Sequence, residues 1–527
     1  MGKVKNILFI MADQLRWDYL TCYGHPTLKT PNIDKLASKG TLFNSAYVQS
    51  PVCGPSRASI YTGRTVFSHG STWNQVPLPI GEYTVGDYLR PYGVKWAVVG
   101  KTHIKPDLTG MKRLGISKKE NIGLIISEPG FDPYERDDGL HPKELLKKRI
   151  KPLNYNQFLN KNGYEGTNPW ETWANSTESK NGKILSGWHL RNSNKPARVS
   201  EEHSETAYMT NKAIEFISEN KNNSWMLHLS YIKPHWPYIA PSPYHNLYGP
   251  NSFIPVHRSD NELQNIHPVY REFTRMNVSK SFSKNKVRET VLSGYMGLIK
   301  QIDDHLGRLF DYLEKEDLFK NTMIVFTSDH GDYLGDHWLG EKELFHEASV
   351  RVPLIIYDPS EKANQSRNKK INSFVEGIDL LPTFIDFINI DAEMHRLEGF
   401  SLLPFLREGK SKNIRKFVFS EIDYGFSKVR ERLSLKPEDA RAYMIRTNSW
   451  KYIYYKGFAP QLFDLKNDKD EFFDLGRSKK HSNIVARMKD LLISKLTDRK
   501  NRITVTDKEV LDRPQSLLKS GIKIGVW

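Results

Sequence analysis

Short apolar runs that alternate with helix-like segments constrain this chain more than any other feature. The runs lie at residues 7–12, 94–99, 225–232 and 323–326. They have no polar face and strand-like length, which is typical of strands buried on both sides of a parallel sheet. Residues 206–217 and 291–313 are helix-like, and in the second segment apolar positions recur every three or four residues. The alternation predicts an α/β fold: a large, mostly parallel, doubly wound sheet flanked by helices.

Local boundaries follow from helix and turn chemistry. Thr30 as a cap, Pro31 at the first helical position and Gly40 after the last one predict a helix between them. Another helix is expected to open at Arg57, after a turn at Pro55. Short strands are predicted at 42–48 and 352–357, and a further helix at 379–388.

The chain changes character near residue 410. Residues 442–447 and 450–455, joined by Asn448 and Ser449, predict an antiparallel hairpin. We therefore expect a main catalytic domain at 1–410, with a loop-rich insertion at 104–200, and a small α+β subdomain with an antiparallel sheet at 411–500. Residues 501–527 form a tail with an apolar end, which we expect at the interface of a homo-oligomer, a dimer or tetramer.

Composition narrows the choice of partner and compartment. The net charge of +16 suits either a small anionic substrate or nucleic acid. Because the charge is dispersed and no nucleic-acid module is recognisable, a basic nucleic-acid-binding protein is the remote alternative. Two cysteines exclude a disulfide framework. No apolar run reaches the roughly 18 residues of a membrane helix, and the run at 7–12 is too short for a signal peptide. We expect a cytoplasmic protein without a membrane partner.

Polar clusters follow the buried runs. They lie at residues 13–14, 100–103, 233–235 and 328–330. One such cluster alone is more often a strand terminus or a helix cap. Because ligands of open α/β sheets bind at the carboxyl ends of the strands, the four together predict one pocket.

The donors in these clusters predict a metal site. Asp13, Gln14, Asp329 and His330 offer carboxylate, amide and imidazole groups. This mixture suits one divalent ion, Mn²⁺ or Ca²⁺ ahead of Mg²⁺, and it does not suit a structural zinc site because no cysteine cluster exists. The alternatives are a helix cap for Asp329 and a surface residue for His330.

Cys53 is a candidate nucleophile. It lies in a turn just before the expected helix and close to Arg57, and both features lower the pKa of a thiol. A lone cysteine is otherwise more often a small buried apolar residue, which is our expectation for Cys22.

The segment Cys53-Gly-Pro-Ser-Arg57, followed by residues 58–64, resembles the motif of the formylglycine-dependent sulfatases of the alkaline phosphatase superfamily. Residues 30–37, the Gly-Lys-x-His element at 100–103 and residues 462–468 are similar to further elements of that family. The resemblance covers nearly the whole chain. It implies the family's fold, a divalent metal, and conversion of Cys53 to formylglycine by a maturation enzyme.

Two branches of that family remain open. The Asp13–Gln14 pair, in place of two aspartates, resembles phosphonate monoester hydrolases and choline sulfatases, and residues 73–78 and 233–245 resemble the phosphonate monoester hydrolase and phosphodiesterase branch. Lys101 and His103 are instead sulfatase-like. We expect a hydrolase of small phosphonate monoesters or phosphodiesters with promiscuous sulfatase activity. The alternative is a cytosolic sulfatase of a small organosulfate.

The resemblance also implies roles for single residues. The hydrated aldehyde at position 53 would attack, and its second hydroxyl would then release the inorganic product. Arg57 would stabilise the deprotonated hydrate, His103 would take its proton, and His235 would protonate the leaving oxygen. The groups expected on the non-bridging oxygens are Lys101, Lys342 and Asn74. A solvated charge is the alternative for Lys342, which stands between two glutamates.

Overall fold

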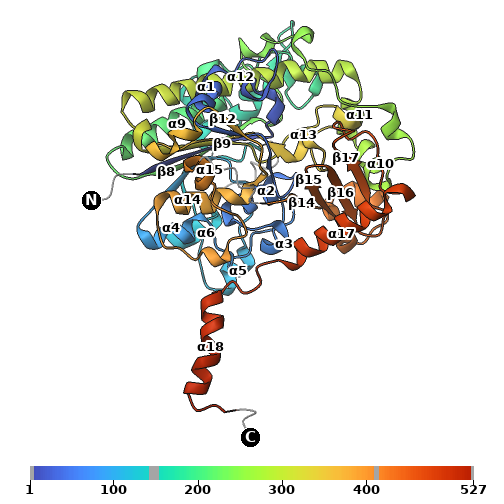
Figure 1. The fold of residues 1–527 in the computed structure, drawn as a ribbon. Coiled ribbons are helices and arrows are strands. Elements are labelled where there is room, and N and C mark those ends of the chain that lie inside the picture. Colours follow the sequence, from blue (N-terminus) through green and yellow to red (C-terminus); the bar gives the residue numbers. More distant parts are fainter. Residues whose placement is uncertain (1–4, 142–152, 409–414, 524–527) are drawn as a thin grey trace.

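An eight-stranded sheet forms the centre of the molecule (Figure 1). The computed structural model describes residues 5–141, 153–408 and 415–523. In the order β12-β2-β11-β9-β1-β8-β4-β5, the strands are Lys369–Ile371, Thr41–Phe43, Leu354–Tyr357, Thr322–Thr327, Asn6–Asp13, Met226–Pro234, Trp96–Gly100 and Asp132–Arg136. The strands from β9 to β5 pair in parallel, and β11 runs antiparallel to both of its neighbours. The predicted mostly parallel sheet is confirmed.

Helices cover both faces of this sheet. The central strand β1 sends Leu8 and Ile10 into one core, where they pack with α1 (Pro31–Lys39), α9 (Glu205–Asn220) and α12 (Asn285–Lys315). Ile7 and Phe9 point into the opposite core, with α2 (Cys53–Thr62) and α14 (Leu380–Ile388). Because strand side chains alternate, a continuous apolar run supplies both cores, and the doubly wound arrangement follows.

Three local predictions are wrong for identifiable reasons. Residues 42–48 are not one strand, because a turn at 44–45 separates β2 from β3 (Ala46–Tyr47), which joins a smaller sheet with β10 (Arg351–Val352) and β13 (Val375–Glu376). Pro353, which has no N–H to donate, likewise separates β10 from β11. The helix expected at Arg57 begins at Cys53, since Pro55 is tolerated in a first turn.

The segment 104–200 is not only loops. It includes α5 (Leu108–Arg113), α6 (Asn121–Ser127) and α8 (Asn154–Lys161), and its strand β5 forms the edge of the main sheet beside β4. Strand β5 is short, and its sequence Asp-Pro-Tyr-Glu-Arg is mostly polar. A search for apolar runs therefore misses it.

The C-terminal region carries a four-stranded antiparallel sheet. Its strands are β14 (Phe417–Asp423), β15 (Arg441–Thr447), β16 (Trp450–Tyr455) and β17 (Gln461–Asp464). The predicted hairpin is β15–β16 and is confirmed. Helix α17 (Ser482–Thr497) packs on this sheet through Met488 and Leu492. The expected boundary at 410/411 falls at 409–414, outside the described residues.

Helix α18 (Asp507–Lys519) extends away from the body of the molecule (Figure 1). Leu511 and Leu517 on it are exposed. The end of the tail, 524–527, lies outside the described residues. None of the helices described has both the length and the hydropathy that crossing a bilayer requires.

Candidate active site

The order of the strands explains how the predicted clusters meet. Strands β9, β1, β8 and β4 are consecutive and parallel, so their carboxyl ends share one edge. Asp13 ends β1, His235 follows β8, and Lys101 follows β4. Asp329 comes shortly after β9, and the first turn of α2 brings Cys53 to the same place.

Four buried side chains form what we call the reaction cluster: Asp13, Cys53, Asp329 and His330. Their ligand-type atoms lie within 4.8 Å of one another, and Cys53 Sγ is 3.0 Å from His330 Nε2. Asp13 Oδ1 is buried without a hydrogen-bond partner among the described groups. Since buried carboxylate oxygens normally have a partner, a cation would complete this site, and its donors fit a hard or borderline divalent ion.

Gln14 lies at the edge of the reaction cluster. Its backbone N–H donates to Asp329 Oδ1 at 3.1 Å, and its side-chain Oε1 accepts from Lys342 Nζ at 2.8 Å. Its backbone adopts a left-handed φ of 64°, a conformation uncommon for a residue with a side chain. The amide carbonyl therefore faces the site from a constrained backbone.

Arg57 and Lys101 neutralise the two carboxylates. Arg57 donates to Asp329 Oδ2 at 2.7 Å and to Asp13 Oδ2 at 3.2 Å, and Lys101 Nζ lies 2.5 Å from Asp13 Oδ2. Burial alone would raise the pKa of Asp13, but Lys101, with Arg57, lowers it. Asp13 is therefore an ionised carboxylate. The other hydrogen bonds of Arg57 go to Ser230, the Lys101 carbonyl and Tyr61 OH, so Arg57 supports the cluster directly.

Positive charges also surround Cys53. Burial would raise the pKa of the thiol, but Lys342, His330 and Lys101 lower it well below its usual value, with a contribution from a hydrogen bond to His103. Burial would correspondingly lower the pKa of Lys342, and Cys53 and nearby acids raise it instead. These cations are already in place, so they would stabilise an anion here without first having to move.

The two predicted acid–base histidines flank the thiol. Burial, with the charges of Lys101 and Lys342, lowers the pKa of His235 to about 4. His235 Nδ1 lies 2.8 Å from the Trp236 carbonyl, so it carries the proton, and Nε2 faces Lys342 Nζ at 3.4 Å. His103 has a left-handed φ of 54°, and its backbone N–H donates to Asp138 Oδ1.

Asn74 hydrogen-bonds the first turn of α2. Its Oδ1 accepts from the Gly54 N–H at 2.8 Å, and a Cβ on Gly54 would lie only 2.9 Å from the same oxygen. Glycine at position 54 therefore permits the contact. Because Gly54 directly follows Cys53 in the chain, this contact holds Asn74 next to the candidate nucleophile, as a ligand for substrate oxygens would need.

Some polar residues at the site were missed by sequence reasoning. Asp332 and Tyr238 both hydrogen-bond the Gln14 side chain, and Ser230 contacts Arg57. The spacing of Asp332, two residues after His330, was an available signal. Tyr238 lies in the segment 233–245 that was noted for its resemblance, but nothing local in the sequence indicates that its side chain faces the pocket.

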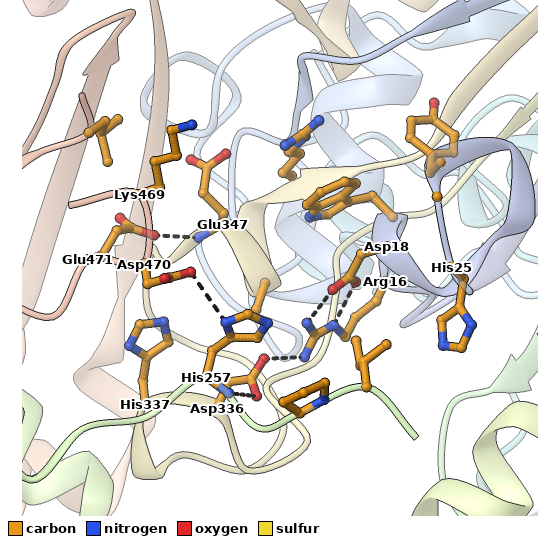
Figure 2. Close-up of a pocket in the computed structure, with 18 of the residues that line it drawn as sticks. Arg16, Asp18, His25, His257, Asp336, His337, Glu347, Lys469, Asp470 and Glu471 are labelled. Carbon is orange, nitrogen blue, oxygen red and sulfur yellow. Dashed lines mark hydrogen bonds and ion pairs between the residues drawn. The ribbon is translucent and has the colours of Figure 1, made fainter. Parts of the chain in front are cut away.

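A separate cleft of about 650 Å³ opens between the main sheet region and the C-terminal sheet (Figure 2). None of the predicted site residues lines it. Its charged groups largely neutralise one another: Arg16 pairs with Asp18 and Asp336, each at 2.6 Å, and His257 pairs with Asp470 at 3.2 Å. The size of this cleft therefore does not make it the reaction site.

A second group of metal-ligand residues lies beside that cleft. Glu262, His337 and His346, which we call the histidine stack, are buried with ligand-type atoms within 4.8 Å of one another. His337 Nδ1 lies 2.7 Å from Glu262 Oε1, and the two imidazole rings are stacked at 3.9 Å with 17° between their planes.

The doubly wound sheet and the carboxylate–imidazole cluster at its strand ends are features of one enzyme class. Residues 5–122 and 131–390 match the family model described as sulfatase, and the chain belongs to this family of ester hydrolases. Residues 335–498 match the model described as N-sulphoglucosamine sulphohydrolase, C-terminal. Members of the family generally use a metal ion and a formylglycine.

Relatives of both branches are similar to the chain over most of its length. A multifunctional alkaline phosphatase superfamily protein, PehA of Trinickia caryophylli, is 29% identical over 91% of this chain and 93% of its own. An arylsulfatase of Clostridium perfringens is 27% identical over 98% and 99%. The structure of a phosphonate monoester hydrolase from Silicibacter pomeroyi superposes with a TM-score of 0.82, 24% identity, and coverage of 96% and 98%.

Proposed function

We propose that this protein is a metal- and formylglycine-dependent hydrolase of small phosphonate monoesters or phosphodiesters, with a promiscuous sulfatase activity. The observation that carries the proposal is the reaction cluster, in which Cys53 lies against His330, Asp13 and Asp329. The resemblance of residues 73–78 and 233–245 to the phosphonate monoester hydrolase branch and the structural similarity to phosphonate monoester hydrolases favour the phosphorus substrate. The Lys101 and His103 pair and the arylsulfatase relative favour the alternative, a cytosolic sulfatase of a small organosulfate.

The metal and the modified Cys53 would supply a nucleophilic hydroxyl of lowered pKa. Asp13, Asp329 and His330, with the Gln14 carbonyl, would hold the ion, Mn²⁺ or Ca²⁺ ahead of Mg²⁺. Arg57 would hold the two carboxylates in place, as its 2.7 Å and 3.2 Å contacts do now, and would stabilise negative charge on the modified side chain. A maturation enzyme would be needed to modify Cys53.

The remaining side chains would bind the substrate and move protons. Lys101, Lys342 and the amide of Asn74 would hold the non-bridging oxygens, whose charge grows in the transition state. His103 would take a proton from the modified Cys53. His235 would protonate the leaving oxygen, and because its pKa is low in the free protein, the negative charge of the bound ester would be needed to raise it.

The proposal extends to the setting of the enzyme. We infer a cytoplasmic location, because residues 7–12 lie in the buried central strand β1 and are needed in the folded protein. We also infer a homo-oligomer, dimer or tetramer, assembled through the tail, because apolar side chains of α18 are exposed. Sedimentation of a chain truncated after residue 500 tests this: an unchanged oligomeric state would contradict it.

Nucleic acid remains the remote alternative, and hydrolysis-free, steeply salt-dependent binding would favour it.

A substrate panel tests the proposed function. An aryl phosphonate monoester, an aryl phosphodiester and an aryl sulfate with the same leaving group would be compared by kcat/KM, using protein from a host that modifies the cysteine. We expect the highest value for a phosphorus ester and a measurable value for the sulfate. A reversed order would favour the sulfatase, and no turnover of any ester would contradict both.

A further inference from the structure

The Gln14 side chain is held at both ends by groups of fixed hydrogen-bonding character. At one end Nε2 donates to Asp332 Oδ2 at 2.5 Å and to Tyr238 OH at 3.0 Å. At the other end Oε1 accepts from Lys342 Nζ at 2.8 Å. Gln14, Asp332 and Tyr238 are all almost completely buried, so water does not replace these contacts.

These partners determine which way the amide points. A lysine ammonium can only donate and an ionised carboxylate can only accept. The carbonyl of Gln14 must therefore face Lys342 and the NH₂ group must face Asp332. A flipped amide would present a donor to the ammonium and an acceptor to the carboxylate, and both contacts would be lost.

Asp332 is itself fixed in place. Its Oδ1 accepts the backbone N–H of Leu334 at 3.0 Å, and its Oδ2 accepts from Tyr238 OH at 2.6 Å in addition to Gln14. Burial raises the pKa of Asp332, and its three hydrogen-bond donors oppose that rise because each of them needs an accepting oxygen. The carboxylate therefore has one oxygen committed to the backbone and the other aimed at position 14. A carboxylate at position 14 would place an acceptor where this oxygen now has an NH₂ donor.

We propose that Asp332 is a positioning residue: its oxygen holds the Gln14 NH₂ group, so that the Gln14 carbonyl faces Lys342 beside the reaction cluster, and an amide rather than a carboxylate is the compatible side chain at position 14. The proposal rests on the metal-dependent function proposed above. It goes further in assigning the amide at this position to a hydrogen-bond acceptor that lies outside the metal ligands. Groups that orient a metal ligand in this way typically change metal affinity by about 10- to 100-fold when they are replaced.

The test is Mn²⁺ affinity of the full, metal-depleted chain, measured by calorimetric titration. In Gln14→Glu two carboxylates face each other, and in Asp332→Asn either the Leu334 N–H or the Gln14 NH₂ loses its acceptor. We expect each single variant to bind Mn²⁺ about 10-fold or more weakly. In the double variant the new amide at position 332 can donate to the new carboxylate at position 14, while its carbonyl still accepts from Leu334. Affinity should then return to within about threefold of the wild type.

A matched control separates positioning from stability. Asp303 is a fully buried residue of α12, and its carboxylate accepts the N–H groups of Asn32 and Ile33 in the first turn of α1. Asp303→Asn should lower the melting temperature without changing Mn²⁺ affinity.

The outcomes distinguish this proposal from the proposed function. Two results would contradict the proposal. One is a Gln14→Glu variant that binds Mn²⁺ as tightly as the wild type. The other is a double variant whose loss of Mn²⁺ affinity equals the sum of the two single losses, because Asp332 would then not determine which side chain is compatible at position 14. If the wild type binds neither Mn²⁺ nor Ca²⁺, the metal-dependent function is wrong, and this proposal is wrong with it.

Discussion

The reaction cluster and the histidine stack both combine carboxylate and imidazole groups, to which the reaction cluster adds the Cys53 thiol, but they differ in where their lone pairs point. Both are buried groups of carboxylate and imidazole. In the reaction cluster, Asp13 Oδ1 has no hydrogen-bond partner among the described groups, and the ligand atoms come from the ends of adjacent strands. In the histidine stack, Glu262 Oε1 already accepts from His337 and from Tyr270 OH, while the buried atom without a hydrogen-bond partner among the described groups is His346 Nε2.

The arrangement of the two imidazole rings also opposes a shared metal ion in the histidine stack. A metal lies in the plane of an imidazole, about 2.0–2.1 Å from its nitrogen. The rings of His337 and His346 are nearly parallel and 3.9 Å apart, so an ion in the plane of one ring is far from the plane of the other. Residue type and proximity alone would suggest two metal sites; the stacked rings favour the reaction cluster over the histidine stack.

The largest expected effect comes from removing Cys53. Cys53→Ala should lower kcat by about 10⁴-fold or more, because the attacking group is lost while the charged pocket remains. Steady-state rates on an aryl phosphodiester measure this, and mass spectrometry of the wild-type peptide should show the aldehyde. Cys22, the other free cysteine, provides the control: Cys22→Ala should retain near-normal activity. An active Cys53→Ala variant would contradict the mechanism.

Metal stoichiometry tests the comparison of the two clusters directly. The wild type should bind one Mn²⁺ per chain. Asp13→Asn should weaken this binding by about 100-fold or more, since a charged ligand is lost, whereas Glu262→Gln should leave one ion bound at normal affinity and lower only stability. Equilibrium dialysis with elemental analysis measures both. Two ions in the wild type, or loss of an ion in Glu262→Gln, would break the comparison.

The sequence predicted the buried parallel strands and the polar residues that follow them. Uniformly apolar runs identified β1 and its parallel neighbours, and the polar residues that follow these runs placed Asp13, Asp329 and His235 at one edge of the sheet. These predictions needed only the rule that parallel strands share an edge. Strand β11 was predicted as a strand, but its antiparallel direction was not, because direction depends on a connection that local pattern does not record.

Lys342 was predicted as a substrate ligand, but the contacts that Lys342 and Tyr238 make with Gln14 escaped prediction, because they depend on backbone conformation and long-range packing. Lys342 reaches Gln14 from a loop in which Leu334, His337, Trp338 and Glu341 all have left-handed φ values. Such conformations are rare for these residue types and are maintained by surrounding contacts. Tyr238 approaches Gln14 from 224 positions away in the chain. No local pattern encodes either placement.

His235 provides a smaller effect that depends on the substrate. If it protonates the leaving oxygen, His235→Ala should slow hydrolysis of an alkyl ester by about 10²- to 10⁴-fold and that of a nitrophenyl ester much less, because nitrophenolate leaves without a proton. A plot of log kcat against leaving-group pKa measures this as a steeper slope. An equal loss for both esters would assign His235 to binding instead.

The two rings of the histidine stack titrate in opposite directions. Burial would lower the pKa of His337, but its bond to Glu262 raises it. Burial, with the charges of His337 and Lys451, lowers the pKa of His346 well below its usual value. The stability that His337 contributes is therefore complete below its unfolded pKa of about 6.5 and is lost as pH rises through the folded value. For His346 the unfolded chain takes up the proton first, so stability is lost as pH falls through about 6.5.

The smallest expected effect is the contrast in stability that follows from these opposite shifts. Urea unfolding at about pH 5.5 and about pH 8.5 should show opposite trends for variants of the two rings, each of order 1 kcal/mol. The deficit of His337→Gln relative to the wild type should shrink on alkalinisation, and that of His346→Gln should shrink on acidification. Parallel trends would mean that the two rings share one environment, and the stack would then have to be treated as a single titrating unit.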